Sequence, residues 1–309
     1  MRNAKGLLLS HFSADPREPS FYVARDSTRG GSHDVVIGVH YPASASEART
    51  VALEYESVPF FGGKAHKALL ANARAVLNAV KPIFLQHLEL DSRVTLTGFS
   101  LGASTAILLH MLLFGEVAHD PDLLLAQSRI TTFAFGAPQV FASLNAEVAG
   151  ANTMPAGIEQ RVFNVIHGFD PTPRLNVRNA VRLLLLCKEI DQQALGGKER
   201  LESLRGRSGA VSCGIPDHAK VCESAAGTFF PVGLPVLLRE QNRGAVSCEV
   251  GAYADAHELR PHRSMFSDSA SQVYLRAASA AAASSSAARP GLCSALDANC
   301  PCLHAVLAL

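Results

Sequence analysis

The sequence lacks a net charge of either sign. Its 309 residues include 28 Lys and Arg and 27 Asp and Glu, so the formal net charge is only +1 at pH 7. Partners such as nucleic acid are recognised by strongly basic surfaces. We therefore expect no nucleic-acid partner.

The sequence also lacks a long hydrophobic run. A membrane-spanning helix needs about 18 or more consecutive apolar residues, and the longest apolar stretches here, 103–114 and 183–187, are shorter. The patch Leu7-Leu8-Leu9 is too brief for the core of a signal peptide, and no N-x-S/T glycosylation site occurs. These features favour a cytoplasmic or peripheral membrane protein over a secreted one.

The cysteines show no metal-binding spacing. There are seven of them, and none forms a C-x-x-C pair with a second pair behind it, so we expect no zinc site and no other metal or cofactor. Free intracellular thiols are the favoured interpretation. A Cys213–Cys222 disulfide in an oxidising compartment and lipidation of the tail cysteines Cys293, Cys300 and Cys302 remain alternatives.

The central stretch of the chain, 93–115, predicts a strand, a sharp turn and a helix. Residues 93–97 alternate and are rich in β-branched side chains, and 103–114 are apolar on nearly every side. Between them stands Gly98-Phe99-Ser100-Leu101-Gly102, a G-x-S-x-G motif. A strand, this motif and a helix form the nucleophile elbow of α/β-hydrolases. A strained turn would project the Ser100 hydroxyl, and the two glycines would let strand and helix approach closely.

The rest of the chain predicts an α/β fold with a mostly parallel central sheet and helices on both faces. Strands and helices alternate, as parallel sheets require. Residues 1–276 are expected to form one domain, and the Ala/Ser-rich segment from 277 begins a linker and tail, 277–309, expected to be disordered. The predicted strands are 20–24, 34–40, 93–97, 130–135, 161–166 and a hairpin of 228–239 with 245–255; the predicted helices are 65–88 (kinked or restarted at Pro82), 103–114, 175–201 and 268–278.

A serine nucleophile needs a base and a carboxylate that orients the base, and in this fold they follow the serine in the order Asp or Glu, then His. Asp170 fits the carboxylate, because it comes just after the predicted strand 161–166. A turn-forming Asp-Pro is the alternative. The competing carboxylates Asp120, Asp122 and Asp191 do not directly follow a strand.

For the base, the later histidines are the candidates. His262 is favoured because it lies in a loop before the last predicted helix, where a mobile general base is expected. His257 is the serious competitor. His218 lies in a polar excursion, 202–220, and His304 lies beyond the linker. A surface histidine with no catalytic task is the alternative for each.

A series of motifs resembles the class 3 lipase family, and its diacylglycerol-lipase-like branch most closely. The resemblance covers 20–276 and implies an α/β-hydrolase that cleaves acylglycerol esters through a Ser-Asp-His triad, which maps to Ser100, Asp170 and His262. The motifs are DVVIGV, GGKAHKALLANARAVLNAV, VTLTGFSLGASTAILL, FAFGAPQV, VFNVIHGFDPTPRL, TFFPVGLPVLL and a late His before a helix with Tyr274.

The chain departs from the family pattern around the oxyanion hole. One donor is expected to be the backbone N–H of Leu101. The second normally follows the first parallel strand, where the family has R-G-T or R-G-S and this chain has His40-Tyr41-Pro42; proline has no N–H. A shift in alignment would let Ala43 or Ser44 donate. Loss of one donor costs other serine hydrolases about 100- to 1,000-fold in turnover.

Other departures lie close to the expected triad. Phe99 stands where the family has His, Pro261 stands where the branch often has Asp before the triad histidine, and Ser104 stands where the branch has Gly in S-L-G-A-G-T-A. Pro261 weakens the assignment of His262.

An apolar lid or acyl-chain wall is expected between the first two parallel strands. Val58, Phe60 and Phe61 lie there beside Gly62-Gly63, with packed core as an equally good alternative. The insertion 202–227 is a second place for a gating element. The sequence thus predicts a di- or triacylglycerol lipase that makes transient contact with a membrane or lipid-droplet surface. A phospholipase A1 or other carboxylesterase, or a weak or inactive lipid-binding protein on the same fold, are the alternatives.

Overall fold

The computed structural model describes the core of the chain and shorter segments around it. All statements about structure below concern these residues. They are 6–13, 15, 18–25, 34–40, 56–89, 92–117, 125–146, 151–174, 188–193, 195–207, 229–240, 246–251, 272–274, 276–277 and 279–280.

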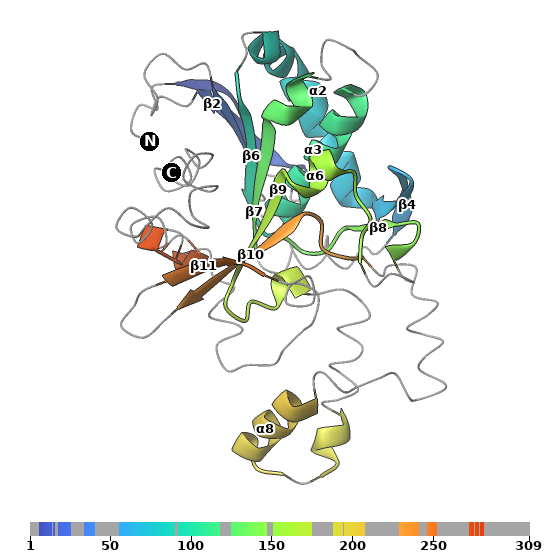
Figure 1. Cartoon of the computed structure of the whole chain (residues 1–309), viewed down its shortest axis with the longest axis vertical. Helices are drawn as coiled ribbons and strands as arrows, with labels where there is room; N and C mark the ends of the chain where they lie inside the picture. Colours follow the sequence, from blue (N-terminus) through green and yellow to red (C-terminus); the bar gives the residue numbers. More distant parts are fainter. Residues whose placement is uncertain are drawn as a thin grey trace.

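A mostly parallel sheet forms the centre of the fold (Figure 1). Its strand order is β1-β2-β3-β6-β7-β9-β10-β11. The pairs from β3 to β10 are parallel, whereas β1, β2 and β11 join antiparallel at the two sides. The strands are β1 (Leu7–His11), β2 (Ser20–Arg25), β3 (Val35–His40), β6 (Val94–Phe99), β7 (Ile130–Phe135), β9 (Val162–His167), β10 (Leu234–Glu240) and β11 (Val246–Val250).

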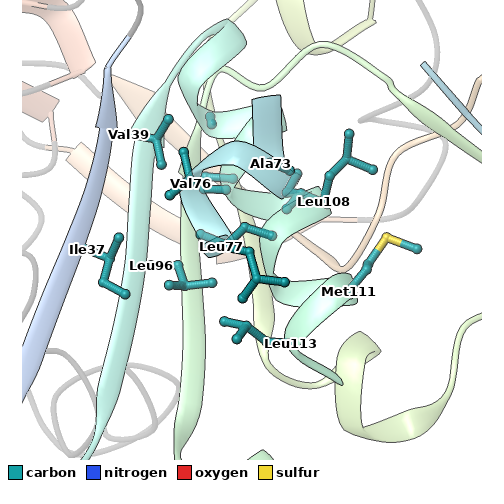
Figure 2. Packing of buried hydrophobic residues seen from close by; sticks show 14 of the residues in the cluster. Ile37, Val39, Ala73, Val76, Leu77, Leu96, Leu108, Met111 and Leu113 are labelled. Atoms are coloured by element: carbon teal, nitrogen blue, oxygen red, sulfur yellow. The ribbon is translucent and has the colours of Figure 1, made fainter. Parts of the chain in front are cut away.

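Two long helices cover one face of this sheet, α2 (Lys67–Glu89) and α3 (Leu101–Val117). Apolar side chains recur along α2 at helical spacing and pack against α3 and the sheet, while α3 is apolar all round, as expected for a fully buried helix. Figure 2 shows this packing around Ile37, Leu96, Val76 and Leu108. By length and composition alone, residues 67–87 of α2 could cross a membrane, but core helices with a buried face pass the same test.

A helical stretch near residue 274 covers the opposite face. Tyr274 and Ala277 are buried there against Phe133, Phe135 and Val165. Side chains alternate between the faces of a strand, so Phe133 and Phe135 point to this side of β7 while Ala134 points toward α3. The predicted architecture, a mostly parallel sheet with helices on both faces, is confirmed.

A small antiparallel sheet stands beside α3. Its order is β4-β5-β8, and the hairpin of its first two strands turns at Phe61 and Gly62, which have φ of 51° and 70°. Short helices and two 3-10 turns lie outside the sheets, and residues 188–191 are also helical. The bounds are β4 (Ser57–Phe60), β5 (Gly63–His66), β8 (Phe141–Ser143), α6 (Ala156–Glu159), α8 (Gly197–Arg207), η1 (Leu125–Arg129) and η2 (Thr172–Arg174).

The structure corrects several sequence-based boundaries. The predicted helix 175–201 is not continuous where the structure describes it: residues 188–191 are helical, 192, 193, 195 and 196 are not, and α8 begins at Gly197 and continues past the predicted end to Arg207. Residues 175–187 lie outside the described residues. Helix α2 runs through Pro82 without a break, and α3 passes Gly115 to end at Val117. The Leu7–Leu9 patch belongs to a strand, β1, which was not predicted.

The boundary between domain and tail stays a prediction. Ala277 is buried at 2% exposure, and residues 279 and 280 are still helical. Most of the proposed linker and tail lies outside the described residues.

Replacing Gly102 with alanine is expected to destabilise the fold by several kcal/mol, because the new Cβ would lie 2.3 Å from the Val39 carbonyl oxygen. Overpacking of this kind costs about 1–3 kcal/mol and sometimes more. Gly115→Ala is the matched control in the same helix: its Cβ would meet only Phe61, at 3.6 Å, and alanine is favoured over glycine in a helix by about 1 kcal/mol. Urea unfolding of both variants checks this, and equal stabilities would contradict it.

Candidate active site

Ser100 lies at the tip of the turn between β6 and α3. Its φ is 54°, a left-handed conformation that is rare for residues other than glycine. A Cβ on Gly98 would come within 2.5 Å of the Gly102 backbone, and a Cβ on Gly102 within 2.3 Å of Val39. The tight turn therefore requires glycine at positions 98 and 102 and strains the backbone of Ser100. A strand, a strained serine turn and a helix packed this closely are the arrangement of a nucleophile elbow.

The start of α3 supplies amides beside Ser100. Leu101 opens the helix, and first-turn N–H groups have no carbonyl partner within the helix. The end of β3 passes directly next to this turn, since the Val39 carbonyl and the His40 Cα are close to Gly102. The role of the Leu101 N–H as an oxyanion donor stays a prediction. The expected second donors, Ala43 and Ser44, lie outside the described residues.

Asp170 is fully buried in the turn that follows β9. The Thr172 backbone N–H donates to its Oδ1 at 2.8 Å, and the Tyr274 hydroxyl donates to its Oδ2. The buried Arg174 guanidinium donates to the Asp170 backbone oxygen at 2.5 Å. The carboxylate is thus held in one orientation, which a turn-forming Asp-Pro alone would not require.

Burial raises the pKa of the Asp170 carboxyl, and the hydrogen bonds from Tyr274 and Thr172 and the charge of Arg174 offset part of that rise. The pKa of Tyr274 is also raised well above its usual value, first by burial and then by the neighbouring Asp170 charge. The phenol therefore stays protonated and acts as the donor in this pair. A carboxylate in such a place can orient an imidazole once it is ionised.

Ser100 and Asp170 lie at the same end of the sheet, because each follows the carboxyl end of its strand and the parallel strands β6 and β9 are separated only by β7. The Ser100 N–H donates to the Phe135 carbonyl at 2.9 Å. The next residue, Gly136, has φ of 60°, and a Cβ there would lie 3.1 Å from Asp170 Oδ2. The backbone at the end of β7 thus contacts both functional residues.

Tyr274 belongs to the candidate site through its contacts, and the sequence interpretation left it without a role. Its ring contacts Phe99 and His167 at centroid distances of 5.5 and 5.8 Å, and its hydroxyl reaches Asp170. Tyr274 thereby connects Phe99, the residue before Ser100, to the carboxylate of Asp170. The sequence signal that could have found Tyr274 was its position in the helix that follows the late histidine, one of the motifs shared with the class 3 lipases.

The candidate histidines His218, His257, His262 and His304 lie outside the described residues, as do Asp120 and Asp122. Asp191 is described, and it pairs with Arg200 near α8. His167, three residues before Asp170, is buried at the sheet face that Tyr274 covers. Its ring nitrogens make no hydrogen bond to another described residue, and its Nε2 lies 3.8 Å from Glu240. Within the described part of the chain, no three His, Cys, Asp or Glu side chains are grouped to hold a metal ion.

The expected lid residues pack against the core. The ring of Phe61 packs against that of Phe114 with a centroid distance of 6.2 Å, and the ring of Phe60 packs against that of Phe141 with a centroid distance of 6.3 Å. At 1.5 Å per helical residue, Phe114 lies about 20 Å along α3 from the end that carries Ser100. Val58 is also partly buried against the core. This packing agrees with the alternative that these residues belong to the core.

Comparison with known families gives one match. Residues 39–180 match the model of the lipase (class 3) family. The matched segment begins at the end of β3 and contains β6, Ser100, β7, β9 and Asp170. It does not separate the diacylglycerol-lipase branch from the rest of the class 3 lipases. No curated protein matches the chain.

Among solved structures, the chain is similar to several fungal lipases. The lipase of Rhizopus microsporus var. chinensis is 18% identical with a TM-score of 0.42, and 55% of each chain is covered. The triacylglyceride lipase of Rhizomucor miehei is 23% identical with a TM-score of 0.41, over 55% of this chain and 60% of that one. Lipase II of Rhizopus niveus is 15% identical with a TM-score of 0.45, over 79% and 70%. The chain thus spans less than two thirds of the length of the first two lipases.

Tyr274→Phe is expected to keep the ring contacts and remove the hydrogen bond to Asp170. This bond lowers the pKa of the carboxyl, so its loss raises that pKa further and moves the acid limb of the activity profile to higher pH. Hydrogen bonds to charged groups contribute about 1.5–3 kcal/mol, so we expect kcat to fall about tenfold or more on the acid limb of the profile and to differ less at higher pH. A pH–rate profile checks this, and a parallel drop at all pH values would contradict it. Phe135→Leu, which changes only the packing against the ring, is the control.

Proposed function

We propose that the protein is a serine hydrolase that cleaves carboxylic esters of acylglycerols, as a di- or triacylglycerol lipase. The observation that carries the proposal is Ser100 in a strained left-handed turn before α3, at the same sheet edge as the buried Asp170. Serine at this turn has no folding advantage over glycine, because the conformation costs about 1–2 kcal/mol. A hydroxyl retained there despite that cost is consistent with use as a nucleophile.

In the proposed mechanism, Ser100 Oγ attacks the ester carbonyl while His262 accepts its proton and Asp170 orients the imidazole and stabilises its charged form. The Leu101 amide, together with a donor from Ala43 or Ser44, stabilises the negative oxygen of the tetrahedral intermediate. The alcohol leaves with the proton from His262, and an acyl-enzyme on Ser100 remains. Water, activated by the same histidine, releases the fatty acid.

The substrate class rests on the match of residues 39–180 to class 3 lipases. The substrate would be an acylglycerol presented at a membrane or lipid-droplet surface, with transient contact between protein and lipid. No residue in the mechanism requires a metal or an organic cofactor.

The test is to label the purified chain with a fluorophosphonate probe and to compare hydrolysis of triacylglycerol, diacylglycerol, monoacylglycerol and phospholipid in mixed micelles. We expect labelling, and turnover greatest with di- or triacylglycerol. Turnover greatest with phospholipid would indicate a phospholipase A1 rather than an acylglycerol lipase. No labelling of folded protein, with or without lipid vesicles, would overturn the proposal in favour of a lipid-binding protein.

A further inference from the structure

Ser104 connects the nucleophile helix to a neighbouring loop. It lies in the first turn of α3, is fully buried, and donates from Oγ to the Pro138 carbonyl at 2.7 Å. Its backbone N–H donates to the Ser100 carbonyl at 3.1 Å. One residue thus binds both the nucleophile and the segment that follows β7.

The segment that follows β7 also binds the turn that carries Asp170. Gln139 is buried and donates from Nε2 to the Pro173 carbonyl at 3.0 Å. Arg174, next to Pro173, donates to the Asp170 backbone oxygen. Contacts therefore run without interruption from Ser100 through Ser104, residues 138–139 and residues 173–174 to Asp170.

We propose that Ser104 and Gln139 are positioning residues that hold Ser100 and Asp170 at their working separation. The proposal rests on the proposed function. Neither side chain touches the reacting atoms. The Ser104 hydroxyl binds the start of α3 to Pro138, and the Gln139 side chain binds the same segment to the turn that carries Asp170. Small displacements of catalytic groups have large effects on rate, up to about 100-fold for 1 Å.

The experiment measures ester hydrolysis and the rate of fluorophosphonate labelling for Ser104→Ala and Gln139→Met. We expect each to lower kcat and labelling rate about tenfold and to leave KM within about twofold, because the effect is on the alignment of the catalytic groups rather than on lipid binding. In an Asp170→Asn background, Ser104→Ala should change the labelling rate less than about twofold, since no working carboxylate remains to be aligned.

Thr97→Val is the matched control. The Thr97 hydroxyl makes the same kind of bond, to the Phe133 carbonyl at 3.0 Å, but between β6 and β7 within the sheet. Its removal should lower stability slightly and leave kcat unchanged. The proposal is overturned if Ser104→Ala matches Thr97→Val in kcat, or if its effect persists undiminished in the Asp170→Asn background. Absence of labelling in the wild-type chain would instead overturn the proposed function and with it this inference.

Discussion

Replacing Ser100 with alanine is expected to lower kcat for ester hydrolysis by about 10⁴- to 10⁶-fold, the range seen when single members of Ser-His-Asp triads are removed. The oxyanion donor and the lipid-binding surface remain, so KM should change little. Fluorophosphonate labelling should disappear. The measurement is turnover of a diacylglycerol in mixed micelles, with the wild-type chain run beside it.

Ser100→Gly is the matched variant for this prediction. It removes the same hydroxyl, but glycine adopts the observed φ of 54° without strain. It should be as inactive as Ser100→Ala and more stable by about 1 kcal/mol. Activity above about 1% of wild type in either variant would show that another group is the nucleophile. Equal stabilities would show that the turn relaxes in solution.

Asp170→Asn is expected to lower kcat about 10⁴-fold, because a neutral amide cannot stabilise the charged imidazole or hold its tautomer. Asp191→Asn is the control, since Asp191 is the other described candidate and pairs with Arg200 on the surface. That variant should retain full activity. Full activity of Asp170→Asn would remove Asp170 from the mechanism, and loss of activity in Asp191→Asn alone would assign the carboxylate to Asp191 instead.

The same variant carries a stability prediction with a defined sign. The folded-state pKa of Asp170 is raised above 3.8 by burial, so the folded chain keeps its proton where the unfolded chain has released it. The stability of the wild type therefore falls as pH rises from about 3.8 through the folded pKa, and Asp170→Asn does not share that loss. The free energy of unfolding of the variant, relative to wild type, should rise across this window in urea titrations. A constant difference would contradict the raised pKa.

Local patterns in the sequence were sufficient to predict the strand and the helix that build the candidate site. The strand and helix around Ser100 were predicted because alternation, an all-round apolar run and two glycines are signals within a short window. Asp170 was found because it follows a strand. The break before α8 and the end of α8 at Arg207 were not predicted, because the polar sequence of this helix lacks a strong apolar period. Gly196-Gly197 was the local signal for that break.

Contacts between distant residues could be decided only by the tertiary structure. Tyr274 reaches Asp170 across 104 residues, and Ser104 meets Pro138 across 34; such pairs leave no periodic pattern in the chain. Phe61, predicted as a lid or as core, packs against Phe114 at the far end of α3, and that contact decides its position. The sequence by itself determined which residues are candidates for the chemistry, because hydroxyl, carboxylate and glycine are properties of single positions. The fold determined what holds them, because orientation and burial depend on neighbours brought together by the sheet.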